Sequence, residues 1–354
     1  MVSCNAASNN GPFCDLARMS GRCDIGCRPE MSWRDERAKP LSLKFGSLMQ
    51  IPGSKASVNL AHVETRDEAT SGQSFPIPLS ERRVNLPSCE TFFLEAGRGR
   101  SLVLLHGLMA YSFSWRKNIS ALADHFHVFA FDLAGCGFSG PLLEGEYGVE
   151  RWSRQLEEFL DFIGLEKVLL VASSAGGAVA LDFASRCPGR VEAMILVAPV
   201  TPYSPRVMFL ARLYSGSGMP SPVLRALLRI TPKLVPWLLR HRYYADSRQV
   251  TPAAIQGYIA GLRNQSTVRM LRESIPGWNP RRQKEQMSRI KTPLLLLWGE
   301  ADKLVPPSCI PRLMQALPHA SSATIPNAGH LLFEETPELF HEQVLKFFGK
   351  APER

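Results

Sequence analysis

The chain has 354 residues, of which 45% are hydrophobic, and it carries a formal net charge of +9. This length and apolar content are sufficient for one α/β domain with a large buried core and some additions. No run of eighteen or more apolar residues occurs, so we expect no transmembrane helix, and no nucleic-acid-binding motif accompanies the positive charge, so we expect no nucleic-acid partner.

Residues 1–75 form an N-terminal extension that lacks apolar periodicity and contains no continuous apolar core of a secretory signal peptide. Three interpretations remain open. The extension is an organellar transit peptide, with a plastid as the destination, or it is the disordered tail of a cytoplasmic protein, or it results from an upstream start codon. Four of the eight cysteines lie here (Cys4, Cys14, Cys23 and Cys27), without the neighbouring histidine or second Cys pair of a zinc site. We therefore expect an intracellular, reducing compartment and no bound metal.

From about residue 80 onward, strand-like and helix-like segments alternate. A pair of strands is predicted between 80 and 96, with further strands at 101–105, 127–131, 167–172, 192–197, 293–298 and 321–325. Helices are predicted near 114–124, 149–163, 175–186, 306–316 and 336–348. This alternation predicts a mostly parallel, doubly wound α/β sheet, with functional groups on the loops at the carboxyl ends of its strands.

Gly135-x-Gly137-x-x-Gly140 follows a predicted strand and formally matches a dinucleotide-binding fingerprint. However, Pro141 comes next and the helical pattern begins only near Val149. No helix N-terminus would then hold a pyrophosphate, so we expect no cofactor.

The segment from Leu169 to Gly177 (LLVASSAGG) has the pattern of a nucleophile elbow. An apolar strand ends on serines and small residues, and a helical pattern follows. Such a turn lifts a serine hydroxyl clear of the sheet, and small neighbours let the turn close. Ser174 occupies the nucleophile position in Ala-x-Ser-x-Gly, whereas Ser173 lacks the spacing to Gly176.

Two later loops supply the partners that a nucleophilic serine needs, in the order acid and then histidine. Asp302 follows the buried strand PLLLLW, and Glu300 beside it is a weaker candidate. His330 follows a short predicted strand in the context Asn-x-Gly-His. A neutral imidazole can accept the serine proton and return it to a leaving group, while a carboxylate fixes its tautomer.

Between Pro199 and about Ile290 the alternation stops, and apolar and basic residues recur with helical spacing, as in 223–229 and 234–240. From Tyr203 to Glu285 there are 14 Arg and Lys against 3 Asp and Glu. A solvated helix face is one interpretation of this charge. Contact of an interfacial helix with an anionic membrane and attraction of acidic substrates are the others.

Taken together, these motifs resemble the α/β-hydrolase family over about residues 76–350. The resemblance rests also on the strand and turn Leu102–Gly107 (LVLLHG), on the turn Asp132–Ser139 (DLAGCGFS) and on the small residues that open the helix after Ser174. It implies a core of residues 76–199 and 291–350 and a helical cap of residues 200–290. Ala172 stands where the family usually has glycine, and we expect the elbow to form with this small residue.

The resemblance also implies the chemistry. Ser174, His330 and Asp302 would be the catalytic triad, and the backbone N–H groups of Leu108 and Ala175 would form the oxyanion hole, with Met109 as the less favoured donor. The expected function is a serine hydrolase that cleaves an ester-type acyl bond of a small or lipid-like substrate. The alternatives are a low-turnover ligand-binding or pigment-synthesis accessory protein of the same fold, or a C–C bond hydrolase. A serine at position 174 argues against relatives that attack with a carboxylate.

Overall fold

The computed structural model describes residues 49–50, 57–58, 79–204, 207, 209 and 233–349. Most of the extension 1–75 therefore lies outside the described residues, as does the predicted helical stretch 223–229. Two short strands within the extension, β1 (Met49–Gln50) and β2 (Ser57–Val58), pair antiparallel.

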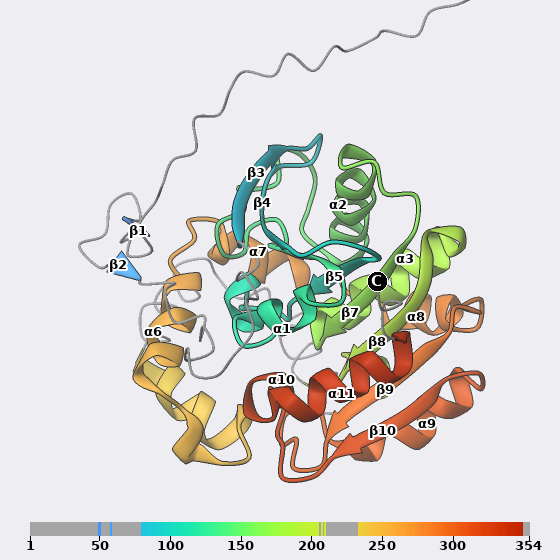
Figure 1. The fold of residues 1–354 in the computed structure, drawn as a ribbon. Helices are drawn as coiled ribbons and strands as arrows, with labels where there is room; N and C mark the ends of the chain where they lie inside the picture. The colour runs from blue at the N-terminus through green and yellow to red at the C-terminus, as the bar shows by residue number, and fades with distance from the viewer. Residues whose placement is uncertain are drawn as a thin grey trace, which may run out of the picture. The chain divides into compact units, whose positions relative to one another are not determined.

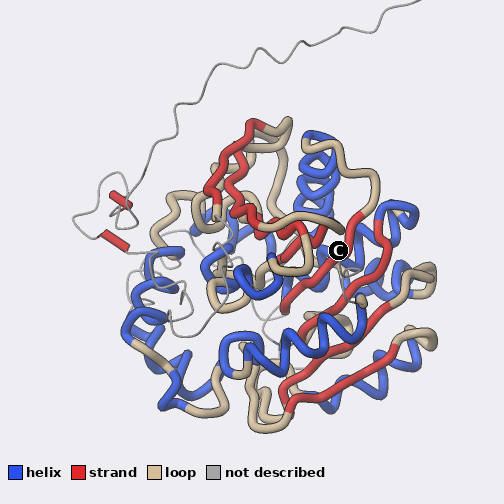
Figure 2. The backbone as a smooth tube through the Cα atoms, viewed as in Figure 1, coloured by secondary structure: helices blue, strands red, loops and turns tan. Residues whose placement is uncertain are grey.

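An eight-stranded sheet forms the centre of the fold, with the order β10-β9-β8-β7-β5-β6-β4-β3 (Figures 1 and 2). Strands β3 and β4 are antiparallel to their neighbours and all other neighbours pair in parallel, which confirms the predicted mostly parallel sheet. The strands are β3 (Ser80–Asn85), β4 (Glu90–Ala96), β5 (Ser101–Leu105), β6 (His127–Phe131), β7 (Val168–Ser173), β8 (Val191–Val197), β9 (Leu294–Gly299) and β10 (Ser321–Ile325).

The central strands are buried on both sides, because alternate side chains enter two separate cores. On β5, Val103 and Leu105 belong to one core, and Leu102 and Leu104 belong to the other. Helices α2 (Val149–Phe162), α3 (Ala175–Arg186) and α9 (Ile310–Ala316) contribute to the first core, and α1 (Ile119–Ala123) and α11 (Pro337–Phe348) contribute to the second. The sheet is thus covered by helices on both faces, as a doubly wound fold requires.

The insertion, defined here as residues 200–290, leaves the sheet after β8 and returns at β9. Its described helices are 233–238, the π-helical turn η3 (Leu239–Tyr243), the 3₁₀ turn η4 (Ser247–Gln249), α6 (Pro252–Gly261), α7 (Thr267–Ser274) and α8 (Pro280–Met287). Side-chain caps explain where α6 and α8 begin. The Thr251 hydroxyl accepts the N–H of Ala254 before α6, and the Asn279 side chain accepts the N–H of Arg282 before α8. A proline follows each cap at the first helical position.

One local prediction was wrong, and one short helix was not predicted. The helix predicted over 114–124 is instead the 3₁₀ turn η1 (Ser112–Trp115) followed by the short α1, and the Ser114 hydroxyl donates to the carbonyl of Tyr111 within η1. The short helix α10 (Leu332–Glu335) was not predicted; its Glu334 and Glu335 side chains bond to Arg116 and to the N–H of Ala245, which are distant in sequence. Two further 3₁₀ turns, η2 (Pro188–Arg190) and η5 (Pro307–Cys309), complete the described elements.

Candidate active site

Ser174 lies on the sharp turn between β7 and α3, at the carboxyl edge of the sheet. Its backbone has φ 53° and ψ −117°, a conformation that costs energy for a residue with a side chain. The surrounding fold enforces it, since the Ser174 N–H donates to Val197 and its carbonyl accepts from Gly177 and Val200. This is the geometry of a nucleophile elbow, and Ser173 is the last residue of the buried strand before it.

Close backbone packing explains the glycines after the elbow. A Cβ atom on Gly176 would lie 2.5 Å from the carbonyl oxygen of His106, and one on Gly177 would lie 2.6 Å from Pro199. Ala172 is fully buried in strand β7, where it pairs with Leu105 of β5. Its methyl group is accommodated in the core, and the elbow forms with alanine at this position.

His330 and Asp302 form a buried pair, with 2.7 Å between Nδ1 of the imidazole and Oδ2 of the carboxylate. The exposed fraction is 1% for His330 and 4% for Asp302. The other carboxylate oxygen accepts the N–H groups of Leu304 and Val305, at 2.8 and 2.9 Å, so the acid cannot rotate freely. Nδ1–H donation to Asp302 leaves Nε2 as the free acceptor of the ring. Glu300, the weaker candidate, is exposed.

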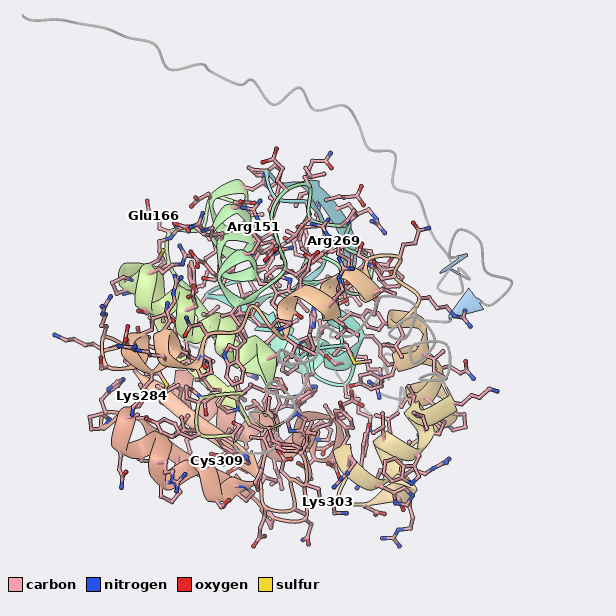
Figure 3. All side chains as sticks on the ribbon, turned by 180° about the vertical axis from the view of Figure 1, so that it is seen from behind. Arg151, Glu166, Arg269, Lys284, Lys303 and Cys309 are labelled. Atoms are coloured by element: carbon pink, nitrogen blue, oxygen red, sulfur yellow. The ribbon has the colours of Figure 1, made fainter. Side chains whose placement is uncertain are left out.

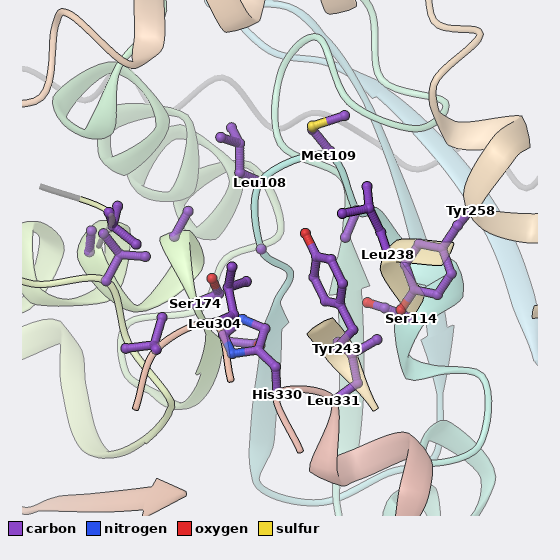
Figure 4. Close-up of a pocket in the computed structure, with 18 of the residues that line it drawn as sticks. Leu108, Met109, Ser114, Ser174, Leu238, Tyr243, Tyr258, Leu304, His330 and Leu331 are labelled. Carbon is purple, nitrogen blue, oxygen red and sulfur yellow. The ribbon is translucent and has the colours of Figure 1, made fainter. Parts of the chain in front are cut away.

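Ser174 and His330 line one cavity of about 590 Å³, and Figure 4 shows them beside each other in it. The polar lining groups that the structure describes are Ser114, Ser173, Ser174, Tyr243, Tyr258, Ser274 and His330, and none of the described lining residues is Arg, Lys, Asp or Glu. Apolar side chains make up most of the remaining lining: Leu108, Met109, Val149, Trp152, Val200, Val207, Val235, Leu238, Leu239, Leu262, Ile275, Trp278, Leu304, Val305, Leu331 and Phe333.

The two predicted oxyanion residues, Leu108 and Ala175, also line this cavity. Ala175 is the first residue of α3, so its N–H has no partner within the helix and lies at the positive end of the helix dipole. Leu108 follows Gly107, on which a Cβ atom would lie only 3.1 Å from Ser174 Cβ. Met109, next in the loop, has φ 62°. The structure therefore brings all five predicted site residues to one place.

Buried His106 supports the loop that carries Leu108. Its Nδ1 lies 2.8 Å from the carbonyl oxygen of Gly107, and its Nε2 accepts the N–H of Leu133 at 3.0 Å. Both contacts require the neutral ring with the proton on Nδ1. Burial lowers the pKa of His106 to about 4, which keeps the ring neutral at physiological pH.

Close packing requires two glycines of the formal dinucleotide fingerprint, Gly135 and Gly137. Cβ atoms on Gly135 and Gly137 would lie 2.7 Å from the Tyr147 ring and 2.2 Å from Oδ2 of Asp132. Asp132 is buried and accepts the N–H groups of Ser112 and Phe138, so it holds its own turn. Helix α2 begins at Val149, away from these glycines. Within the described residues, no group of His, Cys, Asp and Glu has the arrangement of a metal site.

Sequence reasoning missed a second buried polar cluster, next to the cavity. The carboxylate of Glu334 is fully buried; it pairs with Arg116 at 2.6 Å and accepts hydrogen bonds from the hydroxyls of Tyr244 and Tyr258. Glu335 beside it accepts backbone N–H groups from the insertion and from the His330 loop. The only sequence signal was two adjacent acids in an otherwise apolar run, four and five residues after His330.

Some of the basic residues of the insertion are paired with nearby acids. Arg269, Arg281 and Arg282 pair with Glu273, Glu285 and Glu150; Arg269 and Lys284 are labelled among the side chains in Figure 3. Arg240 and Arg242 are exposed and have no ion-pair partner among the residues that the structure describes. Near them, Leu234 and Trp237 expose 47% and 52% of their surface. Among the described residues, no helix combines the length and apolarity needed to cross a membrane.

Comparison with known proteins agrees with this fold. The family model described as the alpha/beta hydrolase fold matches residues 100–337. The fold and the site thus define a hydrolase-type α/β protein, and the chain belongs to the α/β-hydrolase-fold family.

Relatives in this family carry out different reactions. The chain is 26% identical to the carboxylesterase YbfK of Bacillus subtilis over 254 residues, which are 70% of this chain and 79% of that protein. The crystal structure of YbfK covers 77% of this chain and 93% of its own, with a TM-score of 0.63. A haloalkane dehalogenase of Mycobacterium tuberculosis is 28% identical over 73% of this chain and 91% of its own length. A 2-hydroxy-6-oxo-6-(2'-aminophenyl)hexa-2,4-dienoic acid hydrolase of Metapseudomonas resinovorans is 27% identical over 76% of this chain and 91% of its own length.

Proposed function

We propose that the protein is a serine hydrolase that cleaves neutral, largely apolar carboxylic esters. The observation that carries this proposal is the buried Asp302–His330 pair, whose imidazole lines the same cavity as the strained Ser174. A serine hydroxyl is a weak nucleophile until an adjacent base accepts its proton. The three groups together match that requirement, whereas a protein that only binds a ligand has no need of all three.

In the proposed reaction the Ser174 hydroxyl attacks the ester carbonyl carbon, and its proton passes to Nε2 of His330. The negative charge that develops on the carbonyl oxygen is stabilised by the N–H groups of Leu108 and Ala175. His330 then protonates the departing alkoxide, which leaves an ester between the acyl group and Ser174. Water, deprotonated by His330, hydrolyses this acyl-enzyme and regenerates the serine. Asp302 holds the tautomer throughout and stabilises the imidazolium.

The cavity favours an ester over the substrates of the other relatives. The relative from Metapseudomonas acts on a dienoic acid, whose carboxylate would enter a lining without any Arg or Lys among the described residues. Burying an unpaired carboxylate is strongly unfavourable. Enzymes of this fold that open carbon–halogen bonds or epoxides attack with a carboxylate, which Ser174 lacks. A neutral ester with lipid-like acyl or alkyl chains fits the volume and apolarity of the site.

A fluorophosphonate probe tests the proposal, because it labels only an activated serine. The wild-type protein should be labelled, and Ser174→Ala and His330→Ala should not. Ser173→Ala is the matched control: it removes the neighbouring hydroxyl and should leave labelling intact. Hydrolysis of p-nitrophenyl esters of increasing chain length should follow the same pattern. Absence of labelling in the wild type would contradict the proposal and favour the ligand-binding alternative.

We also propose that this hydrolase works at the surface of an anionic membrane. The helix 233–238 directs Val235 and Leu238 into the cavity and leaves Leu234 and Trp237 exposed. The exposed Arg240 and Arg242 follow directly. Exposed apolar side chains next to unpaired cations are typical of an interfacial helix, and the apolar cavity suits substrates that dissolve in a membrane.

A further inference from the structure

Glu335 is a buried carboxylate that connects the insertion to the loop of His330. One of its oxygens, Oε1, accepts the N–H of Gly329 at 2.7 Å. The other, Oε2, accepts the N–H groups of Ala245 and Asp246 at 2.7 and 3.3 Å. Glu335 is 6% exposed, and burial raises its pKa. It forms no ion pair within the described part of the chain, so its contacts with backbone N–H groups are its main polar interactions.

Tyr243 makes a second connection between the same two segments. Its carbonyl oxygen accepts the N–H of His330 at 2.7 Å and the N–H of Leu331 at 3.3 Å. Its ring stands edge-on to the imidazole of His330, with 5.7 Å between the centroids, and lines the cavity (Figure 4). The backbone on both sides of the His330 Cα is therefore fixed by partners that contact the insertion or belong to it.

The packing at this junction leaves little room for movement. A Cβ atom on Gly329 would lie 2.5 Å from the carbonyl oxygen of Tyr243 and 2.7 Å from the backbone nitrogen of Ala245. The loop that carries Asp302 is also bonded to the His330 loop, since the N–H of Ala301 donates to the carbonyl of Ala328 at 2.9 Å. The acid loop, the histidine loop and residues 243–246 thus form one hydrogen-bonded unit.

The contact with Asp302 fixes the orientation of the imidazole ring, but the position of the ring depends on its backbone. A displacement of about 1 Å at a reacting group can lower a rate roughly 100-fold. Loss of the Glu335 carboxylate would release Gly329 from Ala245 and Asp246 and leave three backbone N–H groups unpaired. The histidine loop could then shift relative to Ser174 without any change in the residues that bind substrate.

We propose that Glu335 is a positioning residue for the catalytic base, which it holds at the correct distance from Ser174 by joining Gly329 to residues 245–246. This inference rests on the proposed function, in which His330 is the base. It assigns to Glu335 an effect on the rate of the chemical step and no role in binding substrate.

The test compares Glu335→Ala and Glu335→Gln with the wild type in the full-length chain. The rate constant of fluorophosphonate labelling and the kcat and KM for p-nitrophenyl butyrate are measured, with circular dichroism as the check of folding. Glu335→Ala should lower both the labelling rate constant and kcat about 10- to 100-fold at an unchanged KM. Glu335→Gln keeps one acceptor oxygen, so it should recover part of the rate. If Glu335→Ala fails to fold, Glu335→Gln carries the test, with a smaller fall in kcat.

Asp182→Asn is the matched control. Asp182 is another buried carboxylate, 2% exposed, and it holds Gln286 of α8 and Arg186 of α3. This variant should lower the melting temperature and leave kcat at the wild-type value.

Three results would overturn the inference. The first is a folded Glu335→Ala or Glu335→Gln protein with the wild-type kcat, the second is a rise in KM alone, and the third is an equal loss of kcat in Asp182→Asn. In each of these cases the wild type would still be labelled, so the proposed function would stand. An unlabelled wild type would overturn the proposed function itself, and this inference with it.

Discussion

Ser174 is held in a strained backbone conformation that neighbouring hydrogen bonds enforce, and other buried residues hold the loops around it. His106 illustrates this point. Its neutral ring connects Gly107 to Leu133 beneath the loop that carries Leu108. Only the neutral form of this ring can make both contacts.

A pH dependence of stability follows from the lowered pKa of His106, which is about 4 against an ordinary value of 6.5. As the pH falls through 6.5, His106 becomes protonated in the unfolded chain but stays neutral in the folded protein. The free energy of unfolding should therefore decrease between pH 6.5 and pH 5, by about 2 kcal/mol from this residue. In His106→Gln the decrease over that interval should be smaller, as measured by urea denaturation. His319→Gln, at an exposed position, should keep the wild-type slope; equal slopes in all three proteins would contradict this prediction.

The candidate triad could be predicted from the sequence because each member follows a buried apolar strand in a family motif. Glu335 and Tyr243 could not be predicted. Their partners lie about 90 residues away along the chain, and nothing in the local sequence indicates which turn of the insertion returns to His330. In the sequence, only the family motif favoured Asp302 over Glu300 as the acid. In the structure, Asp302 is buried against His330, whereas Glu300 is exposed.

At the scale of elements, the contact between the elbow and strand β5 decides whether helix α3 can begin where it does. Strands β5, β6 and β10 and helix α3 have the predicted bounds, because continuous apolar runs and a clear helix start identify them. The interrupted segment 112–123 and helix α10 depend on tertiary contacts, and sequence patterns do not reveal them.

Gly176→Ala should destabilise the protein by about 1–3 kcal/mol, because the new methyl group would overlap the backbone carbonyls of Leu105 and His106. The elbow and the N–H of Ala175 would shift with it, so kcat should fall as well. Gly189→Ala is the matched control, since a Cβ atom there meets nothing within 4 Å, and its effect should stay within about 0.5 kcal/mol. Urea denaturation and ester hydrolysis measure the two effects. Wild-type stability in Gly176→Ala would show that the backbone relaxes at no cost.

At the scale of the whole molecule, charge and apolar surface meet on the part of the insertion next to the cavity. The net charge of +9 does not by itself select a partner. The arrangement supports the proposed membrane contact, because Arg269 of α7 and Arg281 and Arg282 of α8 form ion pairs, whereas Arg240 and Arg242 are exposed without an ion-pair partner among the described residues.

The proposed membrane contact predicts that the protein sediments with vesicles rich in phosphatidylserine at low salt and not with neutral vesicles. Replacing both Arg240 and Arg242 by Ser should weaken vesicle binding about tenfold or more, at about 1 kcal/mol for each cation near the surface. Trp237→Ala should weaken it as well, and high salt should abolish the electrostatic part. Replacing Arg98 and Lys167, two exposed cations elsewhere, removes the same charge and should have little effect. If both double variants lost the same vesicle affinity, binding would depend on net charge alone, and the proposed contact through Arg240 and Arg242 would be wrong.

The hydrogen bond from His330 to the carbonyl of Tyr243 bears on how this protein could be re-engineered for other substrates. An exchange of the whole insertion at its ends on the sheet would remove the acceptor of the His330 backbone N–H. The part of the insertion that can be exchanged without loss of this hydrogen bond is therefore shorter than the whole segment between β8 and β9. A graft that keeps residues 239–246 with the host would preserve this contact, and the new segment would still have to replace the hydrogen bonds that Val200 and Tyr258 donate to Ser174 and Glu334.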